Sequence, residues 1–264
     1  MSAEAGAVSQ ESKAEGGLRL LPVVGLPIVQ PGDDLAALLA AALAPLQPRD
    51  RDVLIITSKI IAKAEGRFVN LRQVAPSAQA IELATTANKD PRLVEVILRE
   101  SVAVSRVAPN VLITRHRLGF ISANAGVDHS NTSADPDVVL LMPSDPDAAA
   151  QHLHEQLSAT FGVYLPVVIC DSHGRPHRLG TVGVAVGVAG MPGVEDWRGR
   201  ADLFGYRLQH TEIGLADMVA SAATLVMGQA AEGVPAVLMR GLNFAPRAGS
   251  AAEIIRPAHL DLYR

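Results

Sequence analysis

The polar segment from Asp171 to Gly180 contains the residue types that a metal-bound polyphosphate requires. An aspartate and a serine are followed by a glycine, a proline and two arginines. Mg²⁺ prefers oxygen ligands and phosphate oxygens, and an arginine guanidinium binds phosphate in bidentate fashion. The alternative is a polar hairpin turn whose two arginines face solvent.

Two other segments contain further oxygen ligands. Asp128-His129-Ser130-Asn131 follows a glycine-containing loop and could present a carboxylate and an amide to a hard cation. Its alternative is an ordinary surface turn, because Asp and Asn favour turns through local hydrogen bonds. Met227 to Val234 offers Gln229 and Glu232, with a solvated helix end closed by a glycine as the alternative.

Lys59 and Lys63 follow a short β-branched run that is typical of a buried strand. Residues four apart lie on one helical face, so a helix beginning at Ser58 would place both lysines close to the end of that strand. We therefore predict that the two ammonium groups converge on an anion.

Other common binding motifs are absent from the sequence. Neither His152 with His154 nor His173 with His177 has a cysteine or third histidine at a recognisable zinc spacing. We expect structural or surface roles for most histidines. The chain also has no P-loop and no Rossmann glycine motif, so any nucleotide binds without either glycine loop.

These segments must be positioned by alternating helices and strands. Asp33 and Asp34 are predicted to cap the first helix, and Asp145 with Pro146 to begin another. The expected helices cover residues 35–44, 78–87, 91–102, 146–160 and 212–231, besides the one from Ser58. The expected strands cover residues 52–57, 138–142, 163–170, 180–190 and 236–239, with a hairpin over 111–116 and 119–122.

This order of elements predicts a mixed α/β fold. Residues 138–170 form a plausible βαβ unit, in which Asp171 would follow the carboxyl end of a strand, the usual ligand side of an open α/β sheet. The glycines between Gly180 and Gly190 predict a strand approached closely by other backbone.

Composition limits the class of protein. The 264 residues are 48% hydrophobic and can bury a substantial core, and the single cysteine cannot form an internal disulfide. The 23 basic and 27 acidic residues are not concentrated as a nucleic-acid surface requires, and no apolar run is long enough to span a membrane. We expect a soluble, cytoplasmic protein without nucleic-acid or membrane partners. Residues 1–20 are predicted to be a disordered leader, residues 21–245 a domain with up to two subdomains, and residues 246–264 a tail.

Taken together, the motifs resemble the F420-0:glutamate ligase family over residues 21–242. The matching residues are Gly25–Val29, Thr57, Ser58, Lys59, Lys63, Asn124–Asp128, Asn131, Asp171, Ser172, Gly174–Pro176, Gly187–Gly190 and Met227–Gln229. The resemblance implies an F420 ligase-like fold with mixed sheets and packed helices. It also implies that GTP and two divalent ions, Mg²⁺ or Mn²⁺, are used to join L-glutamate to coenzyme F420-0, with K⁺ as an additional ion and a homodimer as the active form.

The resemblance assigns roles to individual residues. It implies that one divalent ion binds Asp128 and Asp171 and a second binds Ser172 and Gln229, with Asp128, Asp171 and Lys63 as the catalytic residues. The implied contacts to GTP are Leu26, Pro27, Ile28, Val29, Ser58, Lys59, Lys63, Asn131, Met227, Gly228, Gln229, Ala230, Ala231, Glu232, Gly233 and Val234. Serine at position 172 and His177 depart from the family pattern, and the second departure puts the wall of the site in doubt.

Two alternatives remain for the function. The first is a ligase or phosphotransferase acting on another carboxylate, because the motifs indicate the nucleotide and the metal more specifically than the substrate. The other is a nucleotide-binding protein without catalysis, against which the separate hard ligands argue.

Overall fold

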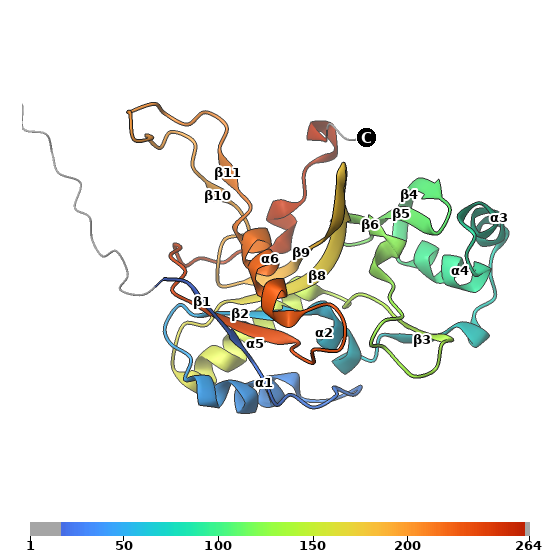
Figure 1. The fold of residues 1–264 in the computed structure, drawn as a ribbon, viewed down its shortest axis with the longest axis horizontal. Helices are drawn as coiled ribbons and strands as arrows, with labels where there is room; N and C mark the ends of the chain where they lie inside the picture. Colours follow the sequence, from blue (N-terminus) through green and yellow to red (C-terminus); the bar gives the residue numbers. More distant parts are fainter. Residues whose placement is uncertain (1–16, 262–264) are drawn as a thin grey trace, which may run out of the picture.

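The centre of the molecule is a five-stranded mixed sheet in the order β1-β12-β2-β8-β9 (Figure 1). The computed structural model describes residues 17–261. The strands are β1 (Arg19–Pro22), β12 (Ala236–Arg240), β2 (Val53–Thr57), β8 (Val167–Arg175) and β9 (Arg178–Ala189). Only β2 and β8 are parallel; the other neighbours are antiparallel.

Helices cover both faces of this sheet. On one face lie α1 (Leu35–Leu43), α2 (Ser58–Ala64) and α5 (Pro146–Phe161), and on the other lies α6 (Leu215–Met227). Successive side chains of a strand point to opposite faces, so Leu54 and Ile56 pack under the first group while Val53 and Ile55 pack under α6. This two-sided burial explains why β2 is an uninterrupted apolar run.

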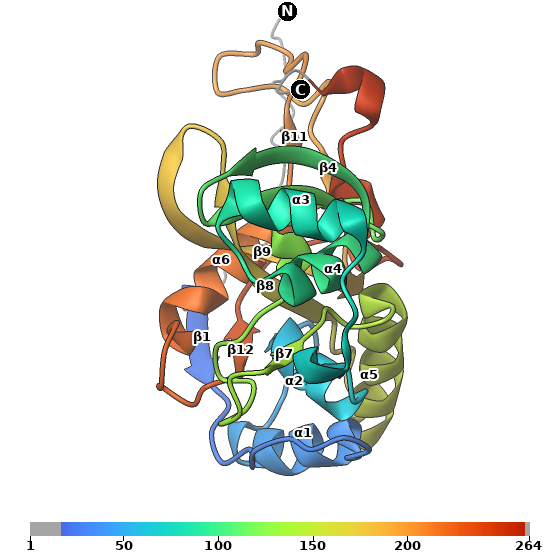
Figure 2. The ribbon, with the colours of Figure 1, turned by 90° about the vertical axis from the view of Figure 1, so that its right-hand side faces the viewer.

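A smaller lobe with its own core lies beside the sheet, on the right in Figure 1. It contains α3 (Ala78–Ala87), α4 (Pro91–Arg99) and a sheet of β4 (Ser101–Ala108), β5 (Val111–His116) and β6 (Ile121–Ala123). The pair β3 (Phe68–Asn70) and β7 (Val138–Leu140) joins this lobe to the sheet region, and Figure 2 shows the lobe from its own side.

The remaining elements are short. The strands β10 (Glu195–Asp196) and β11 (Glu212–Ile213) form the base of a projecting arm, residues 195–213 (Figure 1). The 3-10 helices are η1 (Ala44–Leu46), η2 (Leu71–Gln73), η3 (Asn124–Gly126), η4 (Ala251–Ile254) and η5 (Ala258–Leu260).

Several predictions from the sequence are confirmed. The fold is mixed α/β, and Asp34 and Asp145 cap α1 and α5 by accepting hydrogen bonds from the Ala37 and Ala148 amides. The close approach to the glycine strand is also real. A side chain at Gly183 would collide with the backbone of α6, and one at Gly187 would collide with the start of α5.

The predicted βαβ unit over 138–170 is wrong. β7 pairs with β3 in a separate two-stranded sheet, and the parallel partner of β8 is β2. The β2-to-β8 connection therefore runs through the smaller lobe before reaching α5. β8 also continues to Arg175 because it forms a long hairpin with β9, so Asp171 lies within the strand rather than after it.

Other element bounds differ from the predictions. The predicted helix 212–231 is only Leu215–Met227, because Glu212 and Ile213 pair with β10 and Gly228 ends the helix with a φ of 73°. The predicted helix 91–102 ends at Arg99, and Ser101 begins the unpredicted strand β4.

The two predicted terminal segments are partly described. Arg19 and Leu20, assigned to the leader, belong to β1, whereas residues 1–16 lie outside the described residues. The predicted tail contains η4, whose Ala251 is buried in the core under α6. No helix within residues 17–261 has the length and apolar character needed to cross a bilayer.

Candidate functional site

One edge of the central sheet gathers four of the five predicted site segments. β1 ends, β12 begins and β2 ends at this edge, because β12 is antiparallel to both neighbours. The parallel pairing of β8 with β2 also stops there, at Thr57 opposite Cys170. The segments 26–29, 58–63 and 227–234 therefore lie close to residues 171–172 of β8, although they are far apart in the sequence.

The first turn of α2 contacts both predicted aspartates. The Ser58 hydroxyl lies 3.4 Å from Oδ1 of Asp171, and the Lys59 ammonium donates to Oδ2 of Asp128 at 2.8 Å. Because Ser58 and Lys59 are adjacent, Asp128 and Asp171 both contact the same turn. Lys59 also donates to the carbonyl and hydroxyl oxygens of Ser130, at 2.6 and 3.0 Å.

The loop containing Asp128 is shaped by three successive left-handed residues, Asn124, Ala125 and Gly126, with φ of 55°, 52° and 68°. A side chain at Gly126 would collide with Met142 and approach Oδ2 of Asp171, so glycine lets the loop pass close to that carboxylate. Backbone hydrogen bonds to Leu140 in both directions fix the far end of the loop.

The Asp128 carboxylate is stabilised as an anion. Its burial raises the pKa, but the hydrogen bond from Lys59, the Ser130 amide at 2.7 Å and the charge of Lys59 more than offset burial, so the pKa lies below its usual range. Asp128 is therefore charged at neutral pH and available to a cation.

The segment after α6 joins the same region through two contacts. Gln229 accepts a hydrogen bond from the Ser172 hydroxyl at 2.9 Å, and the carbonyl of Ala230 accepts one from the Asn131 amide at 2.7 Å. The structure thus ties the Asp128 loop to the segment 227–234. Glu232 turns back on its own loop, where it accepts from the Ala230 amide at 2.7 Å.

Asp171 and Ser172 lie on opposite faces of β8. Cys170 packs beneath α6, near Met227, and the alternation of a strand then turns Asp171 towards α2 and Ser172 towards the end of α6. The two predicted ligand pairs, Asp128 with Asp171 and Ser172 with Gln229, are therefore presented on the two faces of one strand.

Lys63 follows Lys59 by one helical turn, as predicted. Among residues 17–261 its ammonium has no hydrogen-bond or ion-pair partner, whereas Lys59 is held by Asp128. Burial first, and the charge of Lys59 second, hold the pKa of Lys63 below its usual value. An unpaired, half-buried cation beside another cation is suited to receive an anion.

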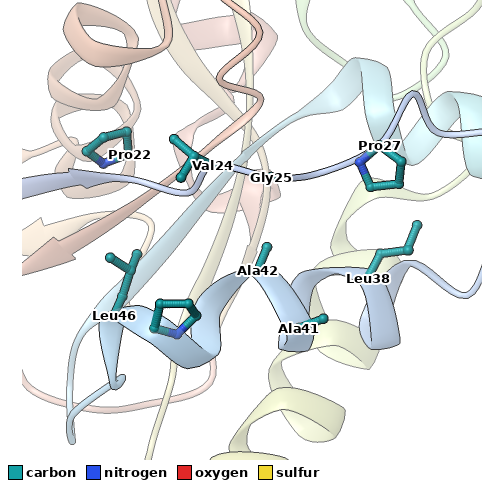
Figure 3. A pocket seen from close by; sticks show the side chains of 9 residues that line it. Pro22, Val24, Gly25, Pro27, Leu38, Ala41, Ala42 and Leu46 are labelled. Carbon is teal, nitrogen blue, oxygen red and sulfur yellow. The ribbon is translucent and has the colours of Figure 1, made fainter.

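The segment Leu26–Val29 connects β1 to α1. Val29 is buried against α2, while Ile28 is 79% exposed. Of the four residues, only Pro27 lines the apolar pocket of about 280 Å³ that Figure 3 shows between this segment and α1. Its other lining residues are Pro22, Val24, Gly25, Leu38, Ala41, Ala42, Pro45 and Leu46.

The two arginines of the Asp171 segment lie away from these contacts. Arg175 donates to the Gly180 carbonyl at 3.0 Å and, like Arg178, belongs to the β8–β9 hairpin turn. Four residues of extended chain separate Arg175 from Asp171, roughly 13 Å. Residues 171–180 therefore form the polar hairpin that the sequence analysis gave as the alternative, with both arginines at its turn. His177, at the turn itself, is farther still along the chain.

His173 contacts the site although no site role is predicted for it from the sequence. Its Nε2 lies 3.0 Å from Oδ2 of Asp171. The signal was the i, i+2 spacing, which places both side chains on one face if residues 171–173 are a strand. A strand predicted to end at Cys170 leaves His173 outside it, so the pairing with Asp171 is not predicted.

The donors fit a hard divalent cation. No group of three or more His, Cys, Asp or Glu side chains suited to a metal ion occurs in residues 17–261. Two carboxylates, a hydroxyl and an amide oxygen remain, and Mg²⁺ commonly uses one or two carboxylates and completes its shell with substrate phosphates and water. This donor set fits Mg²⁺ or Mn²⁺ better than a softer ion.

Comparison with known proteins identifies the family. A family profile described as F420-0:gamma-glutamyl ligase matches residues 24–241. The chain belongs to this F420-0:gamma-glutamyl ligase family. The match includes every predicted site segment, from 26–29 to 227–234.

Similar proteins in the F420-0:gamma-glutamyl ligase family are archaeal proteins named coenzyme F420:L-glutamate ligase. That of Methanopyrus kandleri is 46% identical over 258 residues, covering 94% of this chain and 100% of the relative. That of Methanothermobacter thermautotrophicus is 42% identical over 252 residues, covering 94% and 99%. That of Archaeoglobus fulgidus is 39% identical over 247 residues, covering 94% and 96%.

Proposed function

We propose that this protein joins L-glutamate through an amide bond to the carboxylate of coenzyme F420-0 and uses GTP. The relatives' names supply the two substrates. The observation that carries the proposal is the convergence of Asp128, Asp171, Ser172 and Gln229 around the start of α2 and the end of α6. Acidic, hydroxyl and amide oxygens beside two lysines suit a metal-bound triphosphate.

The reaction requires the carboxylate to be activated first. A carboxylate oxygen of F420-0 attacks the γ-phosphorus of GTP, which forms an acyl phosphate and releases GDP. The amine of glutamate then attacks the acyl carbon and expels phosphate, which leaves an amide and releases one proton. Phosphoryl transfer of this kind needs positioning and charge neutralisation more than covalent help from a side chain.

Different residues of the chain are proposed to hold the divalent ions, the phosphates and the rest of GTP. Asp128 with Asp171, and Ser172 with Gln229, would hold two divalent ions, whose charge would neutralise the triphosphate. Lys59 and Lys63 bind phosphate oxygens. The segments 26–29 and 227–234 and the Asn131 amide contact the rest of GTP, and Asn131 already joins the last of these segments.

The Lys59–Asp128 ion pair must be rearranged when the substrates bind. Each group now neutralises the other at 2.8 Å. A divalent cation would be held by Asp128 and a phosphate by Lys59, so each group would have a new partner of opposite charge. Both charges are compensated before and after the exchange, which avoids leaving a partly buried charge unpaired.

A homodimer is part of this proposal. The arm, residues 195–213, projects from the molecule in Figure 1, and two apolar side chains near its tip, Leu203 and Phe204, are 98% and 95% exposed. Large apolar side chains exposed together often mark an interface. A second copy of this chain is the occupant we propose.

The deciding experiment supplies the protein with GTP, Mg²⁺ or Mn²⁺, glutamate and F420-0, and detects added glutamyl units by mass spectrometry. ATP in place of GTP tests the nucleotide preference. Phosphate release with another carboxylate, but none with F420-0, would favour the alternative that the protein is a ligase acting on a different substrate. Nucleotide binding without any turnover would favour the non-catalytic alternative.

Asp171→Ala should abolish product formation in this assay because it removes one of the two carboxylates proposed to hold a divalent ion. Asp50→Ala is the matched control, since Asp50 precedes β2 at the opposite edge of the sheet. Thermal unfolding of both variants shows whether the fold is kept. Turnover by Asp171→Ala equal to that of the wild type at limiting Mg²⁺ would contradict the assignment.

A further inference from the structure

Three aromatic rings in contact lead from Asp171 into the smaller lobe. The His173 ring lies 5.2 Å from the Phe120 ring, and Phe120 lies 4.7 Å from the His116 ring, with the last two planes only 4° apart. We call His173, Phe120 and His116 the aromatic stack. It connects β8 to the β5–β6 hairpin, so the two lobes meet beside the candidate site.

The far end of the aromatic stack is firmly held. His116 is fully buried, and its Nδ1 accepts the Leu118 amide at 3.0 Å, which places the ring proton on Nε2. That Nε2 faces Oε2 of Glu100 at 3.5 Å. The same carboxylate oxygen accepts from Arg67 at 2.9 Å and from Arg117 at 3.3 Å. The His116 ring thus cannot turn without breaking a buried contact.

The near end of the aromatic stack meets Asp171. His173 is only 10% exposed, and it shares one face of β8 with Asp171 because the two are two residues apart. The Asp171 carboxylate accepts, so the Nε2 of His173 must donate the proton of their 3.0 Å contact. The other carboxylate oxygen, Oδ1, is then left on the side of Ser58 and α2.

We propose that His173 is a positioning residue for Asp171. Its Nε2–H holds Oδ2 and thereby fixes the plane of the carboxylate, while Phe120 prevents the imidazole from turning away. This inference rests on the proposed function, in which Asp171 binds a divalent ion. Groups that orient a metal-binding carboxylate typically contribute about 10- to 100-fold to metal affinity.

The test separates the hydrogen bond from the ring. His173→Phe keeps a ring in the stack but removes the donor, and His173→Gln keeps a donor. Mn²⁺ is titrated into each purified protein without nucleotide, and free Mn²⁺ is followed by its electron paramagnetic resonance signal. His173→Phe should weaken Mn²⁺ binding about 10-fold or more, and His173→Gln should recover most of the affinity.

Phe120→Leu tests the support of the ring. It keeps the His173 donor and removes only the aromatic face beside it, so a smaller loss of Mn²⁺ affinity is expected than for His173→Phe. Thermal unfolding is measured for every variant. If His173→Phe does not fold, His173→Met and His173→Gln give the same comparison, because their side chains are similar in length and only the second has a donor.

The outcomes distinguish this inference from the proposed function. Equal Mn²⁺ affinity for the wild type and a folded His173→Phe variant would overturn the positioning role and leave the ligase proposal intact. Failure of the folded wild type to bind Mn²⁺ both alone and with GTP present would overturn both the positioning role and the metal role of Asp171. Loss in the Phe variant with recovery in the Gln variant would support the proposal.

Discussion

At the scale of single residues, the two lysines of α2 are in different electrostatic states. Lys59 is neutralised by Asp128, whereas Lys63 has no partner within residues 17–261. A half-buried ammonium without a counter-ion loses solvation and has no favourable charge interaction to replace it. Burial, together with the charge of Lys59, therefore lowers the pKa of Lys63. Binding a phosphate would supply the missing partner, so Lys63 should contribute more to GTP binding than its exposure alone suggests.

Lys63→Met should raise the GTP concentration needed for half-maximal binding by roughly 10- to 150-fold, because a charge-assisted contact contributes roughly 1.5–3 kcal/mol. Nucleotide binding by calorimetry measures this. Lys89→Met is the matched control, since Lys89 is also a half-buried lysine of lowered pKa but lies between α3 and α4. Equal losses in the two variants would remove Lys63 from the site.

The same residue predicts a pH effect. Lys63 carries its charge below its pKa, which lies beneath 10.5, so GTP affinity should fall as pH rises through that lowered value. The Lys63→Met variant should lack this component of the pH dependence, because it has no charge to lose.

At the scale of elements, Glu100 joins three segments of the smaller lobe. It follows α4, and its carboxylate meets Arg67 before β3 and both Arg117 and His116 at the β5–β6 turn. Burial raises the pKa of Glu100, but the nearby His116 ring and the charges of Arg67 and Arg117 outweigh burial and lower it to about 2. The carboxylate therefore stabilises the lobe as an anion.

This ion-pair cluster predicts acid sensitivity. A depressed folded-state pKa gives stability that is present above the unfolded value near 4.5 and is lost as pH falls towards 2. The loss should be roughly 3 kcal/mol. Urea unfolding between pH 7 and pH 3 should show a shallower decline for Glu100→Gln than for the wild type.

The control for this measurement is Glu82→Gln, which changes an exposed carboxylate on α3 in the same way. It should follow the wild-type pH curve. A Glu100→Gln curve parallel to the wild type would show that the cluster contributes no linked stability.

At the scale of the whole molecule, the central sheet collects distant segments at one edge, and the arm extends the molecule on another side (Figure 1). The arm carries its apolar tip far from the three cores, so the tip contributes nothing to folding of one copy. Its proposed role is association.

The wild type should therefore elute with twice the monomer mass in size-exclusion chromatography with light scattering. A double change of Leu203→Asp and Phe204→Asp should shift it to the monomer, because charges would be buried at the interface. Ile81→Asp, an apolar-to-acidic change exposed on α3, should not. A monomeric wild type, or a double variant that stays dimeric, would refute the arm as the interface.

The local elements of this protein follow from short-range sequence patterns. Hydrophobic runs and caps predicted β2, α1, α3, α5 and β12 within a few residues, because periodicity and capping act over one or two turns. Residue chemistry also singled out Asp128, Asp171, Ser172 and Gln229 as oxygen donors. Glycine spacing predicted the close approach of other backbone to β9 before any partner was known.

Which of these elements meet depends on long-range contacts that the fold reveals. Strand pairing depends on contacts between distant residues, which local sequence patterns do not encode. The pairing predicted for β7 within a βαβ unit was therefore wrong, and the extension of β8 past Asp171 was not predicted. Because β8 extends past Asp171, Asp171 and Ser172 lie on opposite faces of the strand, and His173 contacts Asp171. Arg175 and Arg178 lie at the hairpin turn, distant from Asp171 along the strand. The oxygen donors could be predicted from the sequence, but the faces of β8 on which Asp171 and Ser172 lie follow from the β8–β9 hairpin.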